Sequence, residues 1–257
     1  MAKTAQKPSI SRKKPLLPQT VGDTSNKGSK CSACGRFILL MFPILGAAMV
    51  ITILFLLSYH LDNSVQDESI SGAMADHEPY WEVVLPLSLG AFFIFIVTIS
   101  RTIQIGVYHR RRKSEITRVR IMNFVAASAN ILAYVGFMLL TLYKIDGDDA
   151  EEKMHIVGAC MYFGLGCLYF ILHDILLLEQ THYPFCIKVV LIMITVPTVF
   201  SCILFGYKQE EAFIFEWIAV ALYAIYVGLF SVLFYIDPAD DEIRDFFFCR
   251  GTGTAKK

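Results

Sequence analysis

The segment 154-MHIVGACMYFGLGCLYFILHDILL-177 is apolar over most of its length and carries small and aromatic residues at a fixed spacing. Six residues at offsets of zero, three, four, eight, eleven and fourteen make the pattern: His155, Gly158, Ala159, Phe163, Gly166 and Tyr169. At about 3.6 residues per turn, these positions lie on one stripe of a helix. Glycine on such a stripe lets the backbone of a second helix come close. The segment therefore predicts a membrane-spanning helix with a specific helix-packing face.

Five further segments have the same apolar character. Together with 154–178, they occupy residues 37–61, 82–107, 119–143, 185–207 and 213–236. Each can cross the hydrocarbon core of a bilayer, which takes about 20 residues of helix. Because lipid offers no hydrogen bonds, the backbone of each segment must bond within its own helix. We predict an all-α, polytopic integral membrane protein with six transmembrane helices.

The chain divides into three parts. Residues 1–36 are polar and basic, a composition typical of disordered tails. Residues 37–236 form the predicted bundle, and residues 237–257 form a second tail, which Pro238 separates from the last helix. No cleavable signal peptide precedes the first apolar segment, so we expect that segment to act as an uncleaved anchor.

The distribution of Lys and Arg predicts the orientation. Of the 23 basic residues, nineteen lie in the two tails and in the even-numbered connections or their flanks. Three lie on the opposite side, at Lys144, Lys153 and Lys208, and the remaining one is Arg101, inside a predicted helix. Basic residues near helix ends favour the cytoplasmic side. We therefore expect both termini to be cytoplasmic and the other face to be acidic.

The cysteines predict neither a disulfide scaffold nor a metal site. Cys31 and Cys34 have the spacing of zinc ligands, but no second pair of ligands accompanies them. Together with Cys249, they lie close to the membrane on the predicted cytoplasmic side, where thiols stay reduced. They are candidates for S-palmitoylation, and inert thiols are the alternative. We expect no metal and no cofactor.

Four of the ionisable residues in or beside the predicted helices are candidates for a functional role. His155 and Glu216 begin two helices on the acidic face, where a histidine could sense pH or simply orient its helix by hydrogen bonding. Arg101 and Asp174 lie near the opposite face. Either they form an ion pair within the bundle, or Arg101 extends to the lipid headgroups.

A basic run occupies the second connection, at Arg110, Arg111, Arg112 and Lys113. Such a run attracts anionic lipid headgroups, at about 1 kcal/mol per charge. The alternative is that it only sets the topology. We expect membrane lipids and unidentified proteins as partners, and no nucleic acid.

The sequence contains no catalytic motif, such as a nucleophile elbow, a metalloprotease helix or a phosphate-binding loop. We therefore name no catalytic residue and expect a protein that is not an enzyme. Paired Gly or Pro interruptions, typical of transporters with inverted repeats, are also missing.

The pattern HxxGAxxxFxxGxxY at 155–169 resembles the damage-regulated autophagy modulator (DRAM) family, which is grouped with the transmembrane protein 150 and Frag/Sfk-type membrane proteins. Asn123, Gly136 and the pair Glu216–Trp217 support the resemblance. Where the family has Ile-Ser-Asp-Thr-Gly in its first connection, this chain continues from Ile70-Ser71 with Gly72-Ala73. We therefore expect a divergent member whose first connection lacks the contacts of that stretch.

The resemblance implies a non-enzymatic multi-pass regulator of autophagy or lysosomal function, in a lysosomal or other endomembrane. A plasma-membrane adaptor in phosphoinositide signalling is the alternative. A factor in glycosylphosphatidylinositol-anchor remodelling is favoured only by the distant relatives. The resemblance implies no catalytic residue.

Overall fold

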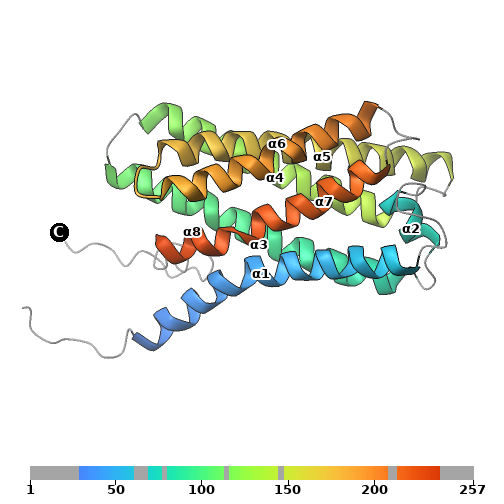
Figure 1. The fold of residues 1–257 in the computed structure, drawn as a ribbon, viewed down its shortest axis with the longest axis horizontal. Coiled ribbons are helices and arrows are strands. Elements are labelled where there is room, and N and C mark those ends of the chain that lie inside the picture. The colour runs from blue at the N-terminus through green and yellow to red at the C-terminus, as the bar shows by residue number, and fades with distance from the viewer. Residues whose placement is uncertain are drawn as a thin grey trace, which may run out of the picture.

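A computed structural model describes residues 29–60, 69–76, 80–112, 116–143, 148–207 and 213–237. The elements in these ranges are all helices (Figure 1): α1 Ser29–His60, α2 Ile70–Asp76, α3 Trp81–Arg112, α4 Ile116–Leu142, α5 Asp149–Glu179, α6 Phe185–Tyr207, α7 Phe213–Gly228 and α8 Phe230–Ile236. Six stretches are long and apolar enough to cross a membrane: Leu39–Tyr59, Trp81–Arg110, Thr117–Leu142, Asp149–Glu179, Phe185–Tyr207 and Phe213–Ile236. The prediction of an all-α multi-pass membrane protein is confirmed.

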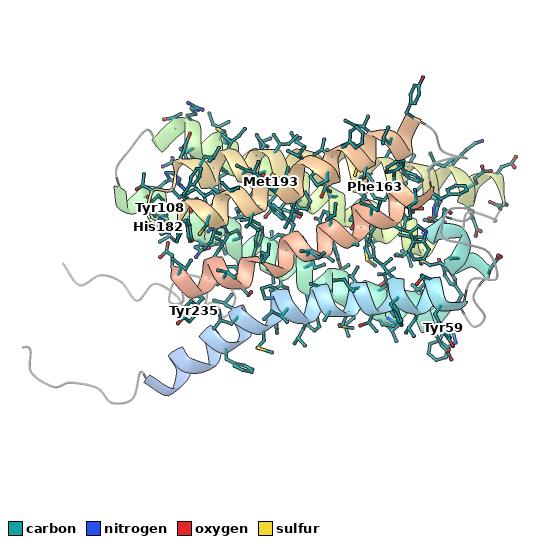
Figure 2. The ribbon with its side chains drawn as sticks, in the orientation of Figure 1. Tyr59, Tyr108, Phe163, His182, Met193 and Tyr235 are labelled. Atoms are coloured by element: carbon teal, nitrogen blue, oxygen red, sulfur yellow. The ribbon has the colours of Figure 1, made fainter. Side chains whose placement is uncertain are left out.

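The long helices run side by side in one bundle whose two ends differ (Figure 1). The short helix α2 lies at one end, together with the beginning of α7, and we call this the Glu216 end. α8 finishes at the opposite end, where α1 begins, and we call this the Arg101 end. The outward-pointing side chains of Tyr59 and Tyr235 mark the two ends (Figure 2).

Helix pairing determines which residues reach the interior. α4 and α5 form the most extensive pair, whereas α1 packs mainly on α3 and α7. α6 packs on α7 and less extensively on α5. The core is rich in aromatic rings, including Phe170, Tyr226 and Phe230, which are fully buried.

Three boundaries differ from the sequence prediction. α1 begins at Ser29, so the last eight residues of the segment 1–36, predicted to be disordered, are helical. Because no proline interrupts residues 29–42, the helix of the apolar segment can extend toward the amino terminus. The first connection contains the unpredicted helix α2, and the last apolar segment is interrupted at Leu229, between α7 and α8.

The beginning of α5 is fixed by a side-chain cap. The Asp148 carboxylate accepts hydrogen bonds from the backbone N–H groups of Ala150 (3.0 Å) and Glu151 (2.9 Å). These donors would otherwise lack a partner within the helix. The cap starts α5 two turns before His155 and thus sets the register of the patterned stripe.

Candidate functional site

The glycines of the α5 stripe bring α5 against α4. A Cβ atom added to Gly158 would lie 2.6 Å from the backbone nitrogen of Leu140 and 2.7 Å from the carbonyl oxygen of Gly136. A Cβ added to Gly136 would lie 2.7 Å from the backbone nitrogen of Tyr162. Both positions therefore face backbone and exclude every residue with a side chain unless the helices separate.

The other small and aromatic residues of the stripe contact α7, the core or a cavity. A Cβ added to Gly166 would lie 3.1 Å from the ring of Tyr223 on α7. Tyr169 is buried in the core, while Ala159 and Phe163 are half-buried and face a cavity toward α6. The sequence predicted a packing face, and in the structure this face contacts more than one helix.

At the Glu216 end, α2 is held by a group of residues that we call the α2 clamp: Ser71, His155 and Glu216. The backbone N–H of Ile70 donates to Glu216 Oε2 at 3.0 Å, and Ser71 Oγ lies 3.5 Å from Glu216 Oε1. The imidazole of His155 lies between Ser71 Oγ (2.9 Å from Nε2) and the carbonyl oxygen of Tyr143 (2.8 Å from Nδ1). Glu216 and His155 are both buried.

The α2 clamp can adopt two proton arrangements. A carbonyl oxygen only accepts, so the Nδ1 of His155 carries the proton that it donates to Tyr143. When Nε2 is unprotonated, Ser71 donates its single hydroxyl proton to His155. When Nε2 is protonated, the imidazolium donates to Ser71, whose proton is then free for Glu216. In both arrangements the hydrogen bond between Ser71 and His155 connects α2 to α5.

The two residues that this chain shares with the family stretch in the first connection, Ile70 and Ser71, are the ones held by the clamp. These contacts are made by the residues before the departure at Gly72-Ala73, and the loss of the family stretch's other contacts stays a prediction. In addition, the backbone N–H of Gly72 donates to Ser69 Oγ at 2.9 Å, which stabilises the first turn of α2.

We expect Glu216→Ala to release α2 from the bundle. The change leaves the buried N–H of Ile70 without its acceptor, which costs about 1–3 kcal/mol. Hydrogen–deuterium exchange of residues 69–76 in the purified protein should become faster, while exchange in α4 stays the same. Asp76→Ala, on the exposed side of α2, is the control and should leave the exchange unchanged. Equal exchange in wild type and Glu216→Ala would show that the clamp does not hold α2.

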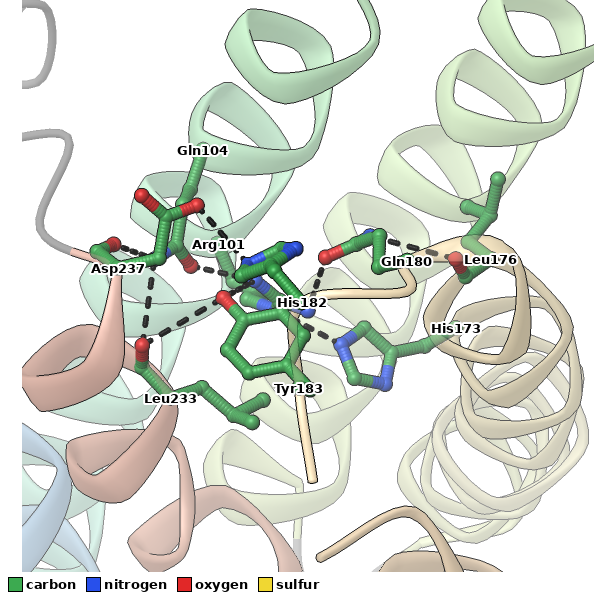
Figure 3. A network of polar contacts seen from close by, with 9 residues as sticks. All are labelled: Arg101, Gln104, His173, Leu176, Gln180, His182, Tyr183, Leu233 and Asp237. Atoms are coloured by element: carbon green, nitrogen blue, oxygen red, sulfur yellow. Dashed lines mark hydrogen bonds and ion pairs between the residues drawn. The ribbon is translucent and has the colours of Figure 1, made fainter. Parts of the chain in front are cut away.

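At the Arg101 end, a buried arginine connects several elements (Figure 3). Arg101 on α3 has 0% exposure. Its Nε donates to His173 Nε2 at 2.9 Å, and Nη1 donates to Gln104 Oε1 at 2.5 Å and to Tyr183 OH at 3.0 Å. Its Nη2 donates to Gln180 Oε1 at 3.2 Å. We call Arg101 and these four partners the Arg101 network.

The Arg101 network continues to a carboxylate. Because His173 Nε2 accepts from Arg101, its Nδ1 carries the proton and donates to Tyr226 OH, at 2.6 Å. Tyr226 OH in turn donates to Asp174 Oδ1 at 2.7 Å. In the described part of the chain, Arg101 and Asp174 are thus connected through two neutral side chains. Both predicted alternatives, a direct ion pair and an arginine extended to the headgroups, are wrong.

The same network fixes the connection between α5 and α6. Burial raises the pKa of Tyr183, so its hydroxyl stays protonated and can donate to the carbonyl oxygen of Leu233, 3.4 Å away. The guanidinium of Arg101 also lies over the ring of Tyr183, at 5.2 Å from its centroid. Gln180 completes the connection by donating to the carbonyl oxygen of Leu176 at 3.3 Å.

The residue that follows α8 is held as well. Gln104 donates to the backbone carbonyl oxygen of Asp237, and His182 Nε2 lies 3.2 Å from the Asp237 carboxylate. The ring of His182 also packs against the ring of Tyr108 on α3, with the two centroids 4.4 Å apart (Figure 2). These two contacts fix the position of Asp237 relative to α3 and the α5–α6 connection.

The candidate sites at the membrane surface are described only in part. Arg110 is exposed on the last turn of α3, and the backbones of Arg111 and Arg112 continue the helix. Lys113 and Cys249 lie outside the described residues, and so do the side chains of Cys31 and Cys34, whose backbones belong to α1. Palmitoylation and headgroup binding remain predictions. The described residues contain no group of three His, Cys, Asp or Glu side chains that could hold a metal ion.

Sequence reasoning missed several members of these clusters. Tyr226 lies three residues after Tyr223 and four before Phe230, a spacing that places the three aromatic rings on one face of the last apolar segment and could have identified it. Gln180 and Tyr183 lie in the short connection after α5, where composition gives no signal. The polar residues of α3 and α4 also bond to each other, since Asn130 donates to Thr98 Oγ1 at 2.5 Å and Asn123 to the Thr102 carbonyl oxygen at 2.9 Å.

The fold and these clusters define a multi-pass membrane protein in which many of the buried polar side chains bond to one another. Residues 34–236, most of the chain, match the family described as the Frag1/DRAM/Sfk1/Cwh43P N-terminal domain. The chain belongs to this family, and the resemblance expected from the sequence is confirmed. No curated protein and no solved structure matches the chain significantly.

Proposed function

We propose that this protein is a non-catalytic membrane regulator that modulates autophagy from a lysosomal or other endomembrane. Membership in a family that includes the DRAM proteins supports this proposal. The observation that carries it is the Arg101 network, which holds the α5–α6 connection and Asp237 against α3. A bundle organised in this way presents its connections and its carboxyl-terminal segment from fixed points, as a scaffold for partner proteins would.

The polar groups of the bundle support a structural role over a chemical one. His155 and Glu216 bind α2, whereas His173, Tyr226 and Asp174 are bonded to each other and to Arg101. A catalytic acid, base or nucleophile must reach a substrate within hydrogen-bonding distance. Most of these side chains are instead buried and engaged with neighbouring helices.

A second candidate function is a plasma-membrane adaptor in phosphoinositide signalling. It is favoured by the position of the basic run, because Arg110 is exposed at the Arg101 end, where α8 also finishes. If both termini are cytoplasmic, as the Lys and Arg distribution predicts, this surface faces anionic lipids.

Endogenous tagging combined with loss of the protein separates the two functions. In the first, the tagged protein overlaps lysosomal markers, and its loss changes the rate of autophagic degradation. In the second, it overlaps plasma-membrane markers, and its loss redistributes a phosphoinositide sensor. Restoration of the phenotype by wild-type protein is required in both cases. If cells that normally contain the protein in lysosomes lose it and their rate of autophagic degradation does not change, the first proposal is contradicted.

A further inference from the structure

A cavity of about 540 Å³ lies between α5 and α6, toward the Glu216 end. Its wall is mostly apolar and includes Ile156, Phe163, Val199, Ile203 and Phe213. On α5 it extends from Glu152 to Cys167, which is about 22 Å at a rise of about 1.5 Å per residue. Cavities of roughly 300–1,000 Å³ hold single small organic ligands. The cavity therefore has the size and length for one lipid-like molecule.

Several residues of the cavity wall are also exposed on the outer surface of the spans. Ile156 on α5 is 44% exposed and Ile203 on α6 is 62% exposed. Gly164 and Gly206 line the cavity from α5 and α6, and a Cβ atom added to either would have no atom within 4 Å. These positions face hydrocarbon in a bilayer, so the cavity is accessible to lipid from the side.

One end of the cavity is polar and acidic. Ser69, Ser71, His155 and Glu216 line it, together with the exposed Glu152. No Lys or Arg is among the described residues of the wall. Carboxyl and serine oxygens accept hydrogen bonds from a hydroxyl group, whereas the exposed carboxylate of Glu152 repels a phosphate headgroup. The polar end thus favours an uncharged headgroup that donates a hydrogen bond.

We propose that the cavity binds an uncharged membrane lipid with a free hydroxyl group. The hydroxyl lies against the polar end of the cavity, and the hydrocarbon body lies between α5 and α6. Sterols and diacylglycerols share this chemistry and are its two sources. The proposal is independent of the regulatory function proposed above, because it rests on the cavity alone.

Photo-crosslinking of the full-length protein in phosphatidylcholine vesicles tests the proposal. Diazirine-bearing sterol, diacylglycerol and phosphatidylcholine probes are compared at equal mole fraction, and the labelled peptides are mapped by mass spectrometry. We expect the sterol or the diacylglycerol to label residues 152–167 and 199–206, and the same lipid without the diazirine to compete. The probe that labels identifies the source.

Two substitutions place a large side chain in the cavity at positions where no described atom lies within 4 Å of the new Cβ. Gly164→Leu and Gly206→Leu should each reduce labelling at least about fivefold, because the new side chains occupy the volume of the lipid. Val196→Leu is the control, since Val196 is 62% exposed on α6 and does not line the cavity. It should leave labelling unchanged. Size-exclusion chromatography shows which variants are folded.

Three results would overturn the proposal. The first is equal labelling by the phosphatidylcholine probe without competition, which would mean that bulk lipid chains fill the space. The second is the absence of labelling by both hydroxyl lipids. The third is undiminished labelling in both folded glycine variants. Since the first two are measured on the wild-type protein, they decide the question even if a variant fails to fold.

Discussion

Gly136→Ala and Gly158→Ala each lower the free energy of unfolding, we expect by about 1–3 kcal/mol, the usual cost of overpacking a close contact. The added methyl group would approach backbone atoms of the facing helix to 2.6–2.8 Å, so α4 and α5 must separate. These two helices form the most extensive pair in the bundle. Unfolding in detergent, followed by circular dichroism, measures the effect.

Gly164→Ala is the matched control, since it makes the same chemical change on α5 where no atom lies within 4 Å of the new carbon. In a helix, replacing an open glycine with alanine stabilises by about 1 kcal/mol or less. We therefore expect Gly164→Ala to be neutral or slightly stabilising. Equal stability of Gly136→Ala, Gly158→Ala and Gly164→Ala would contradict the close packing of α4 on α5.

Arg101→Met should cost about 3 kcal/mol, because it leaves the buried oxygens of Gln104 and Gln180 without their donor. The methionine keeps much of the apolar volume, so the effect reports the lost hydrogen bonds. Local opening of the structure should be greatest at residues 180–183 and at the end of α8. We expect hydrogen–deuterium exchange to become fastest there relative to wild type.

Arg110→Met is the control for this substitution, because Arg110 is exposed on the same helix. It removes the same charge and should leave stability within about 0.5 kcal/mol of wild type. If Arg101→Met unfolds like Arg110→Met, the Arg101 network does not stabilise the Arg101 end. Faster exchange spread evenly over the bundle would likewise contradict a local role for the network.

The spans could be predicted from the sequence because a run of about 20 apolar residues is the length of helix that crosses a bilayer and is uncommon elsewhere in proteins. The glycine stripe also gave the correct face of α5, since its period matches the helix. The partner of each stripe position could not be predicted, because helix order and crossing depend on contacts between distant segments. Gly158 meets α4, whereas Gly166 meets Tyr223 on α7.

The polar clusters were predicted only as isolated residues. His155 and Glu216 were singled out, but their common target, α2, lies in a connection without apolar periodicity. Arg101 and Asp174 were paired correctly as neighbours but not as direct partners, because His173 and Tyr226 stand between them. Bridging side chains of this kind are ordinary residues of apolar segments, and only the packed structure shows that they meet.

We propose that the bundle is a scaffold and that function lies in the segments it presents. One rescue experiment in cells lacking the protein tests it, by comparing a chain that ends at Asp237 with Asp174→Asn and Glu216→Gln. The two amide variants keep oxygen acceptors for Tyr226 and Ile70 but remove the acid chemistry. We expect both to restore autophagic degradation when folded and correctly located, and the truncated chain to fail. Full rescue by the truncated chain, together with loss of rescue in a folded and correctly located amide variant, would contradict the claim and assign the function to the buried carboxylates.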